Sequence, residues 1–191
     1  AHEQSRWPKT KLNEQISVGT DLRLLYLAGD NAQTAVGSLN NTFFQMQGDF
    51  YVAFEPDPQF VLYLDRGTGT SYEIFVLARV LPWHGYLKGG RFVPDIGWRW
   101  DDHTRYTREK LDLDFPGATE SGIEIGVAPG ALSASGGIYN GNDGSPFDDN
   151  PQKMVVGRAL YRWRMGKMNA ALGGSTRWNP GPESKERLWG V

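Results

Sequence analysis

Three arginines share one side of a single predicted strand, and their chemistry is the binding of anions. Between 154 and 165 the sequence alternates, so that Arg158, Arg162 and Arg164 lie opposite an apolar row. A guanidinium binds carboxylate or phosphate through two parallel hydrogen bonds. With Arg79 and Arg91 on other strands, these arginines predict a positive track along an inner wall.

The same arginines have a second interpretation, in which they neutralise carboxylates on neighbouring strands and only stabilise the wall. The carboxylates available for this pairing are Asp49, Asp65, Glu73 and Glu124. The sequence leaves both interpretations open.

The sequence contains little that would support a catalytic site or a metal site. The three histidines lie in no known catalytic motif. Asp101, Asp102 and His103 are adjacent, and the stretch 140–149 is rich in Asn and Asp, but neither has the spacing of a calcium loop. Asn, Asp and Gly are common turn formers. We therefore predict no catalytic residue, no metal and no cofactor, and an enzyme ranks third among our hypotheses.

Composition excludes several classes of protein. The 191 residues are 39% hydrophobic and hold no run of about 20 apolar residues that a spanning helix needs. A net charge of −2 provides no basic surface for nucleic acid. No cysteine is present, so disulfides and thiolate metal sites are excluded.

Apolar and polar residues alternate with a period of two along much of the sequence, and this pattern predicts an all-β fold. In "FFQMQGDFYVAF" (43–54), one face is apolar and the other is largely polar. Nine such segments are predicted as strands: 16–27, 43–54, 60–65, 71–80, 86–93, 123–127, 132–139, 154–165 and 168–178.

The apolar faces belong either to the core of a soluble β-sandwich or lipocalin-like barrel, or to a lipid-facing surface. Short connections (EPDPQ, LPWHG, APGA, MGK) alternate with longer ones, and aromatic residues lie near strand ends. Both features are typical of outer-membrane barrels. We therefore predict an antiparallel transmembrane barrel with two sets of side chains. The lipid-facing set is Phe44, Met46, Phe50, Val52, Phe54, Leu62, Leu64, Ile74, Val76, Ala159, Tyr161 and Trp163; the lumen-facing set is Gln45, Gln47, Asp49, Asp65, Glu73, Arg158 and Arg162.

Three stretches between 43 and 177 resemble a known family. They are "YLKGGRFVPDIGWRWDDHTRYTREKL", "SGIEIGVAPGALSASGGIYNGNDG" and "VVGRALYRWRMGKMNAALGGS". Their order and turn pattern are similar to the phosphate-selective porin O and P type of Gram-negative outer-membrane barrel. The resemblance implies a passive pore in a barrel of about sixteen strands and a loop after the fifth strand that folds inward. It does not imply phosphate specificity.

The predicted organisation has three parts: a periplasmic extension (1–15), strands and loops (16–178) with a long external loop at about 94–119, and the start of a further external loop (179–191). Because bacterial barrels have even strand numbers, nine strands predict the N-terminal part of a larger barrel. Within the long loop, 98–111 favours a short helix. Arg105, Arg108 and Lys110 are either constriction-loop residues that border the pore or part of an exposed cap.

Two functions follow from this prediction. The first is an outer-membrane channel for passive diffusion of small hydrophilic solutes, weakly anion-selective, lined by Asp49, Asp65, Glu73, Arg79, Arg158, Arg162 and Arg164. The alternative is a structural barrel that anchors or sheathes a partner, such as an electron-transfer or surface protein. Lipid and solutes are the expected partners, a homo-oligomer is compatible with both functions, and nucleic acid is excluded.

Overall fold

The computed structural model describes residues 11–27, 33–34, 37–38, 42–67, 72–97, 119–141, 151–166, 168–180 and 186–190. Within these ranges the chain forms strands and no helix. The main sheet contains β1 (Ile16–Leu27), β4 (Thr42–Asp57), β5 (Phe60–Gly67), β6 (Tyr72–Leu81), β7 (Gly85–Phe92), β8 (Glu120–Val127), β9 (Leu132–Tyr139), β10 (Met154–Met165), β11 (Met168–Asn179) and β12 (Glu186–Gly190). Two short strands, β2 (Gln33–Thr34) and β3 (Gly37–Ser38), pair separately.

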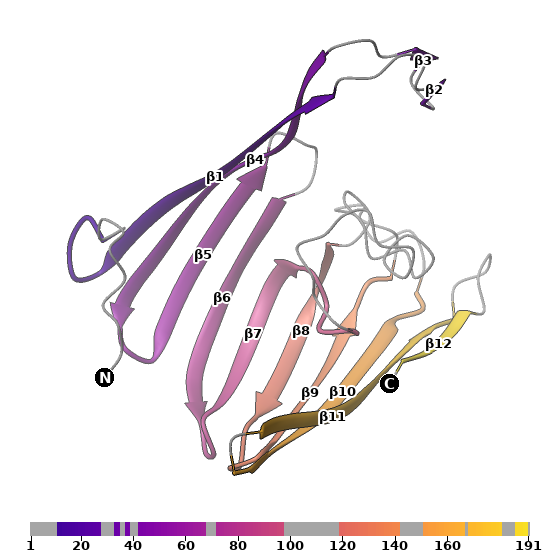
Figure 1. Cartoon of the computed structure of the whole chain (residues 1–191). Coiled ribbons are helices and arrows are strands. Elements are labelled where there is room, and N and C mark those ends of the chain that lie inside the picture. The colour runs from indigo at the N-terminus through magenta and orange to yellow at the C-terminus, as the bar shows by residue number, and fades with distance from the viewer. Residues whose placement is uncertain are drawn as a thin grey trace.

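The main sheet is a simple meander. Its ten strands follow chain order, each hydrogen-bonded antiparallel to the next. Figure 1 shows them as a curved wall that stays open between β1 and β12. The all-β antiparallel prediction is confirmed, and β1 and β4 to β11 match the nine predicted strands. Closure into a barrel is not observed.

A tenth strand was not predicted. The stretch 179–191 was expected to begin a loop, but Glu186–Gly190 pairs with Ser175–Asn179 of β11 as β12. The prolines and glycine at 180–182 directed the prediction toward a loop, and five residues are too few for alternation to stand out.

Tight connections lie together at one end of the sheet. They join β4 to β5, β6 to β7, β8 to β9 and β10 to β11, as Figure 1 shows along its lower edge. Three of these turns need a left-handed backbone, which Gly130 and Gly166 adopt with φ of 67° and 59°. In the β6–β7 turn Trp83 and His84 adopt it instead, with φ of 59° and 54°. We call this the turn end and the opposite one the loop end.

The two faces of the sheet differ in chemistry. The outer face exposes apolar side chains across neighbouring strands, with Ile123 61% and Ile138 58% exposed where β8 pairs with β9. The sheet curves around the other, inner face (Figure 1). Cross-strand partners share a face, so the register confirms that these predicted residues share the outer one: Phe50, Val52, Phe54, Leu62, Leu64, Ile74, Val76, Ala159, Tyr161 and Trp163.

The alternation predicted for the whole of 43–54 is interrupted. The register of β1 and β4 shifts between Arg23 and Leu24, so that Gln47 pairs with Arg23 but Gln45 pairs with Leu24 of the outer face. The predicted lumen-facing position of Gln45 is therefore wrong. Met46 is the extra residue of this bulge, and a bulge redirects the residues that follow it. The side chains of Phe44, Met46 and Gln47 lie outside the described part of the structure.

Candidate functional site: the inner face of the sheet

Ionisable side chains gather on the inner face. In the register Asp65 faces Glu73, Lys88 faces Glu124, and Arg158 lies between Ser135 and Ser175. The predicted lining residues Asp49, Asp65, Glu73, Arg158, Arg162 and Arg164 all occupy inward positions. This face is therefore the candidate site.

A segment after β7 folds across the inner face. Residues 93–97 follow Phe92, and both Pro94 and Ile96 are buried. The backbone N–H of Val93 donates to Glu73 Oε1 (2.7 Å), and that of Gly97 donates to Ser175 Oγ (2.9 Å). Segment 93–97 is thus held at both ends, by β6 and by β11. It begins the long connection that the family resemblance predicted to fold inward.

Apolar side chains pack beneath segment 93–97. Phe92, Ile96, Tyr139, Met154 and Val156 form one buried cluster, in which Phe92 and Tyr139 are 0% and 1% exposed. Burial of this cluster stabilises the inward position of the segment, at about 25 cal/mol for each Å² of apolar surface. The loop-end half of β7 to β10 is therefore covered on its inner side.

Arg158 is paired, but with a partner that the sequence analysis did not consider. Its Nη1 contacts Asp95 Oδ1, and Ser135 Oγ donates to Asp95 Oδ2 (2.8 Å). Asp95 comes from segment 93–97 and lies 63 residues before Arg158. The predicted pairing of the arginines with Asp49, Asp65, Glu73 and Glu124 is wrong for Arg158, because β10 pairs with β9 and β11 and none of these carboxylates lies there.

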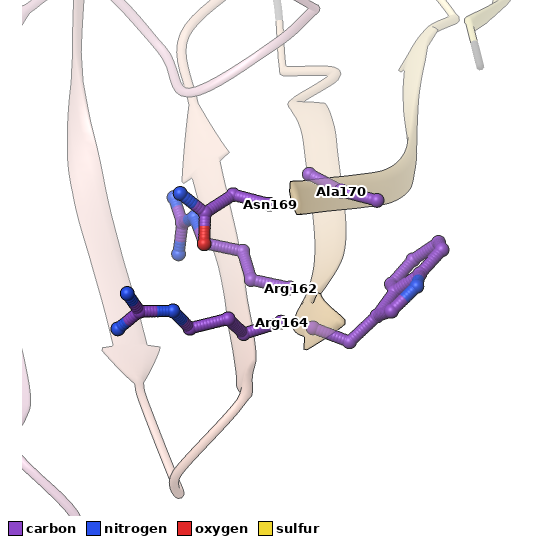
Figure 2. Close-up of a pocket in the computed structure, with 6 residues that line it drawn as sticks. Arg162, Arg164, Asn169 and Ala170 are labelled. Carbon is purple, nitrogen blue, oxygen red and sulfur yellow. The ribbon is translucent and has the colours of Figure 1, made fainter. Parts of the chain in front are cut away.

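Arg162 and Arg164 remain exposed. Neither forms an ion pair with a carboxylate of the described residues; Arg162 Nη1 only donates to Ser133 Oγ at 3.4 Å. Figure 2 shows both side chains and that of Asn169 extending to the same side of the β10–β11 hairpin, with Ala170 on the other. Together with Trp163, Ala170 and Ala171, these three side chains border a hollow of about 340 Å³ at the turn end of the hairpin. Two guanidinium groups beside an amide are suited to binding an anion.

The two remaining arginines of the predicted track separate. Arg79 is exposed at the turn end, where its Nη1 donates to the carbonyl oxygen of Pro58 (3.2 Å). Arg91 pairs with Ile74 and Ser121 on the outer face, so it does not belong to the track. It is only 6% exposed, lies over the Tyr72 ring and donates to Thr119 Oγ1 (3.1 Å).

The inward carboxylates are held by neutral donors. Glu124, 4% exposed, accepts hydrogen bonds from Tyr86 (2.6 Å) and Tyr139 (2.7 Å). Asp65 accepts one from the hydroxyl of Tyr63 (3.2 Å). Each hydroxyl donor fixes the orientation of the carboxylate that accepts its hydrogen bond.

An aromatic stack, which sequence reasoning missed, crosses the inner face. Ring centroids are 6.2 Å apart for Tyr51 and Tyr63 and 5.0 Å apart for Tyr63 and Phe75. The Lys88 ammonium lies 4.1 Å from the centre of Phe75 and 3.8 Å from that of Phe92. The only signal in the sequence was the presence of aromatic residues at positions of the otherwise polar face.

Other predicted residues lie outside the described part of the chain. These are the constriction-loop candidates Arg105, Arg108 and Lys110, the helix at 98–111, and the acidic groups at 101–103 and 142–149. Within the described residues, no group of three His, Cys, Asp or Glu side chains is placed to hold a metal ion. The same residues contain no helix long and apolar enough to cross a membrane.

Comparisons with protein-family models, with curated proteins and with solved structures found no match. The resemblance to phosphate-selective porins therefore stays a prediction.

Proposed function

We propose that this sheet is part of the wall of a transmembrane β-barrel in a bacterial outer membrane, and that its inner face lines a water-filled pore for small hydrophilic solutes. One observation carries the proposal: apolar side chains are exposed on the outer face, while the charged side chains lie mostly inside, with Arg66 and Arg91 as the outward exceptions among the described side chains. A soluble sandwich or barrel buries its apolar face, and a membrane barrel directs it into lipid.

Closure of the wall is part of the proposal. Only Ser175–Asn179 of β11 has partners in β12. Among the described residues, β1 has a strand partner on one side, and its other edge has only the isolated bridge from Lys11 to Ser17. In lipid, unpaired backbone groups cost several kcal/mol each. We therefore propose that further strands pair with both edges and complete a wider barrel.

Segment 93–97 narrows the lumen in this proposal. It lies across the inner face between Glu73 of β6 and Ser175 of β11, and its Asp95 neutralises Arg158. Arg162 and Arg164 remain as exposed fixed cations. They support a weak preference for anions, because lining charges dominate the field inside a narrow tube.

The test uses the absence of cysteine from the chain, which lets single cysteines carry spin labels at chosen sites. With the full chain in lipid vesicles, labels at Leu64→Cys and Ile125→Cys should collide with oxygen, which concentrates in lipid. A label at Ala171→Cys, exposed on the inner face, should collide with a water-soluble nickel chelate. Nickel-accessible labels at Leu64 and Ile125 would refute the membrane assignment.

A conductance measurement distinguishes an open pore from a barrel whose lumen is filled by another protein. Channels in a planar bilayer would support the pore. Lipid-facing labels without conductance would favour a barrel whose lumen is filled by a partner.

A further inference from the structure

Charge on the inner face is distributed unevenly among the strands. On β1, Asp21 and Arg23 form an ion pair with each other (3.2 Å). β10 and β11 contain four inward arginines and no Asp or Glu: Arg158, Arg162, Arg164 and Arg177. The inward positions of β4, β5 and β6 carry the carboxylates Asp49, Asp65 and Glu73. The cation Arg79 lies at the turn end of β6.

The acidic and basic strands lie on different sides of the curve. Three strands, β7 to β9, separate them in the sheet, and the sheet bends around its inner face (Figure 1). The inward charges of these three strands are Lys88, Glu120 and Glu124, and the two glutamates are each 4% exposed. Asp95 lies on the basic side, where it forms an ion pair with Arg158.

We infer that the lumen is polarised across its width, with an acidic wall at β4–β6 and a basic wall at β10–β11. This polarity favours small zwitterions, which carry an ammonium and a carboxylate group, over neutral solutes of equal size. The inference rests on the proposed pore and specifies its solute class.

The physical reason is that a zwitterion has one orientation in which its ammonium and its carboxylate are each attracted by the wall that they face. Its ammonium faces Asp49, Asp65 and Glu73, and its carboxylate faces the arginines, which bind carboxylates through two hydrogen bonds. A simple ion is attracted by one wall and repelled by the other, so the preference for anions stays weak. A neutral solute gains nothing from the field.

Glycine and glycolamide provide a matched pair of probes, because they are isomers and only glycine is a zwitterion at neutral pH. Vesicles containing the full-length protein are diluted into each solute, and the swelling rate of protein-free vesicles is subtracted. We expect the glycine-to-glycolamide rate ratio to be about threefold higher for the unmodified protein than for Arg162→Gln with Arg164→Gln, from Coulomb attraction at about 8 Å in water.

Two controls identify the origin of the ratio. Arg66→Gln removes a cation from the outer face and should leave the ratio unchanged. With 1 M KCl on both sides the Debye length falls to about 3 Å, and the ratio should fall to that of the double variant.

The outcomes separate the two proposals. Swelling in both solutes, with equal ratios for the unmodified protein and the double variant, overturns the zwitterion inference and leaves the pore intact. No swelling above protein-free vesicles in either solute overturns the pore, and the inference with it.

Discussion

Replacing Asp95 by Asn tests whether segment 93–97 sets the charge of the proposed lumen. The substitution keeps the size of the side chain and its hydrogen bond with Ser135 Oγ, but removes the charge that faces Arg158. The ion pair is 23% exposed at Arg158 and 30% at Asp95, so its net contribution to folding is discounted to about 1 kcal/mol. Segment 93–97 should stay in place, because Glu73, Ser175 and the buried Ile96 still hold it.

The larger effect of Asp95→Asn is on the electrostatic attraction of anions to the wall. Without Asp95, Arg158 adds one uncompensated positive charge to the wall. At about 5 Å in water this charge attracts an anion by about 0.8 kcal/mol, and screening at 0.1 M salt leaves about 0.5 kcal/mol. The local concentration of chloride, and with it the chloride-to-potassium permeability ratio, should therefore rise about twofold.

The assay is the reversal potential in a planar bilayer under a KCl gradient, with the full-length protein. Asp95→Asn alone should shift it toward the chloride potential, and Asp95→Asn with Arg158→Gln should return it to the wild-type value. An unchanged potential in the single variant, or a shift that persists in the double variant, would show that the pair does not control selectivity.

Three further predictions follow from the same structure. Arg162→Gln with Arg164→Gln should lower the chloride preference in the same assay, because neither cation has an ion-pair partner among the described residues; an unchanged reversal potential would contradict this. Ile123→Lys, at an outer position that is 61% exposed, should destabilise the protein in lipid vesicles by about 2–4 kcal/mol if it lies at mid-membrane, measured by urea unfolding followed by tryptophan fluorescence. In that assay Gly126→Ala should cost about 1–3 kcal/mol, because a Cβ would meet the Tyr86 ring at 2.4 Å. Gly136→Ala, whose Cβ would have no neighbour closer than 3.9 Å, should be near neutral, and equal losses for the two glycine variants would refute the crowding argument.

The sequence predicted strands well because the alternation of apolar and polar side chains is a local signal. The limits of β10 match the predicted 154–165 at both ends, and those of β9 match 132–139. Partners of side chains are not a local signal. Asp95 reaches Arg158 because segment 93–97 turns inward after β7, and no periodicity encodes that turn.

Arg91 and Lys88 show a second limit of sequence reasoning. The segment 86–93 required one of these cations to take the less polar face, and the intervening Gly89 and Gly90 removed the evidence for choosing. The structure places Lys88 inside, between the rings of Phe75 and Phe92, and Arg91 outside, against Tyr72. Aromatic rings that accept a cation lie on both faces. The register with the neighbouring strands therefore determines which face each residue takes.

The aromatic stack looks like a surface on which solutes could slide, but its ring faces are occupied. Tyr51 lies against Gly19, where a Cβ would meet ring atoms at 2.1 Å, and its other neighbour in the stack is Tyr63. Phe75 has Tyr63 and the ammonium of Lys88 as neighbours. In the proposed pore the stack is therefore part of the wall, and contact with solutes is left to the charged groups.

The glycines explain how the wall can bend around so many rings. On the concave side of a curved sheet, side chains of neighbouring strands converge, so a ring needs a partner without a side chain. At the inward Gly122, Gly126 and Gly137, a Cβ would lie within 2.3–2.4 Å of a neighbouring atom. At the outward Gly136 and Gly157, the nearest atom would be 3.9 and 3.7 Å away. Away from the turns, this contrast ties the curvature to the inner face, because there a side chain would collide with a neighbouring ring or backbone.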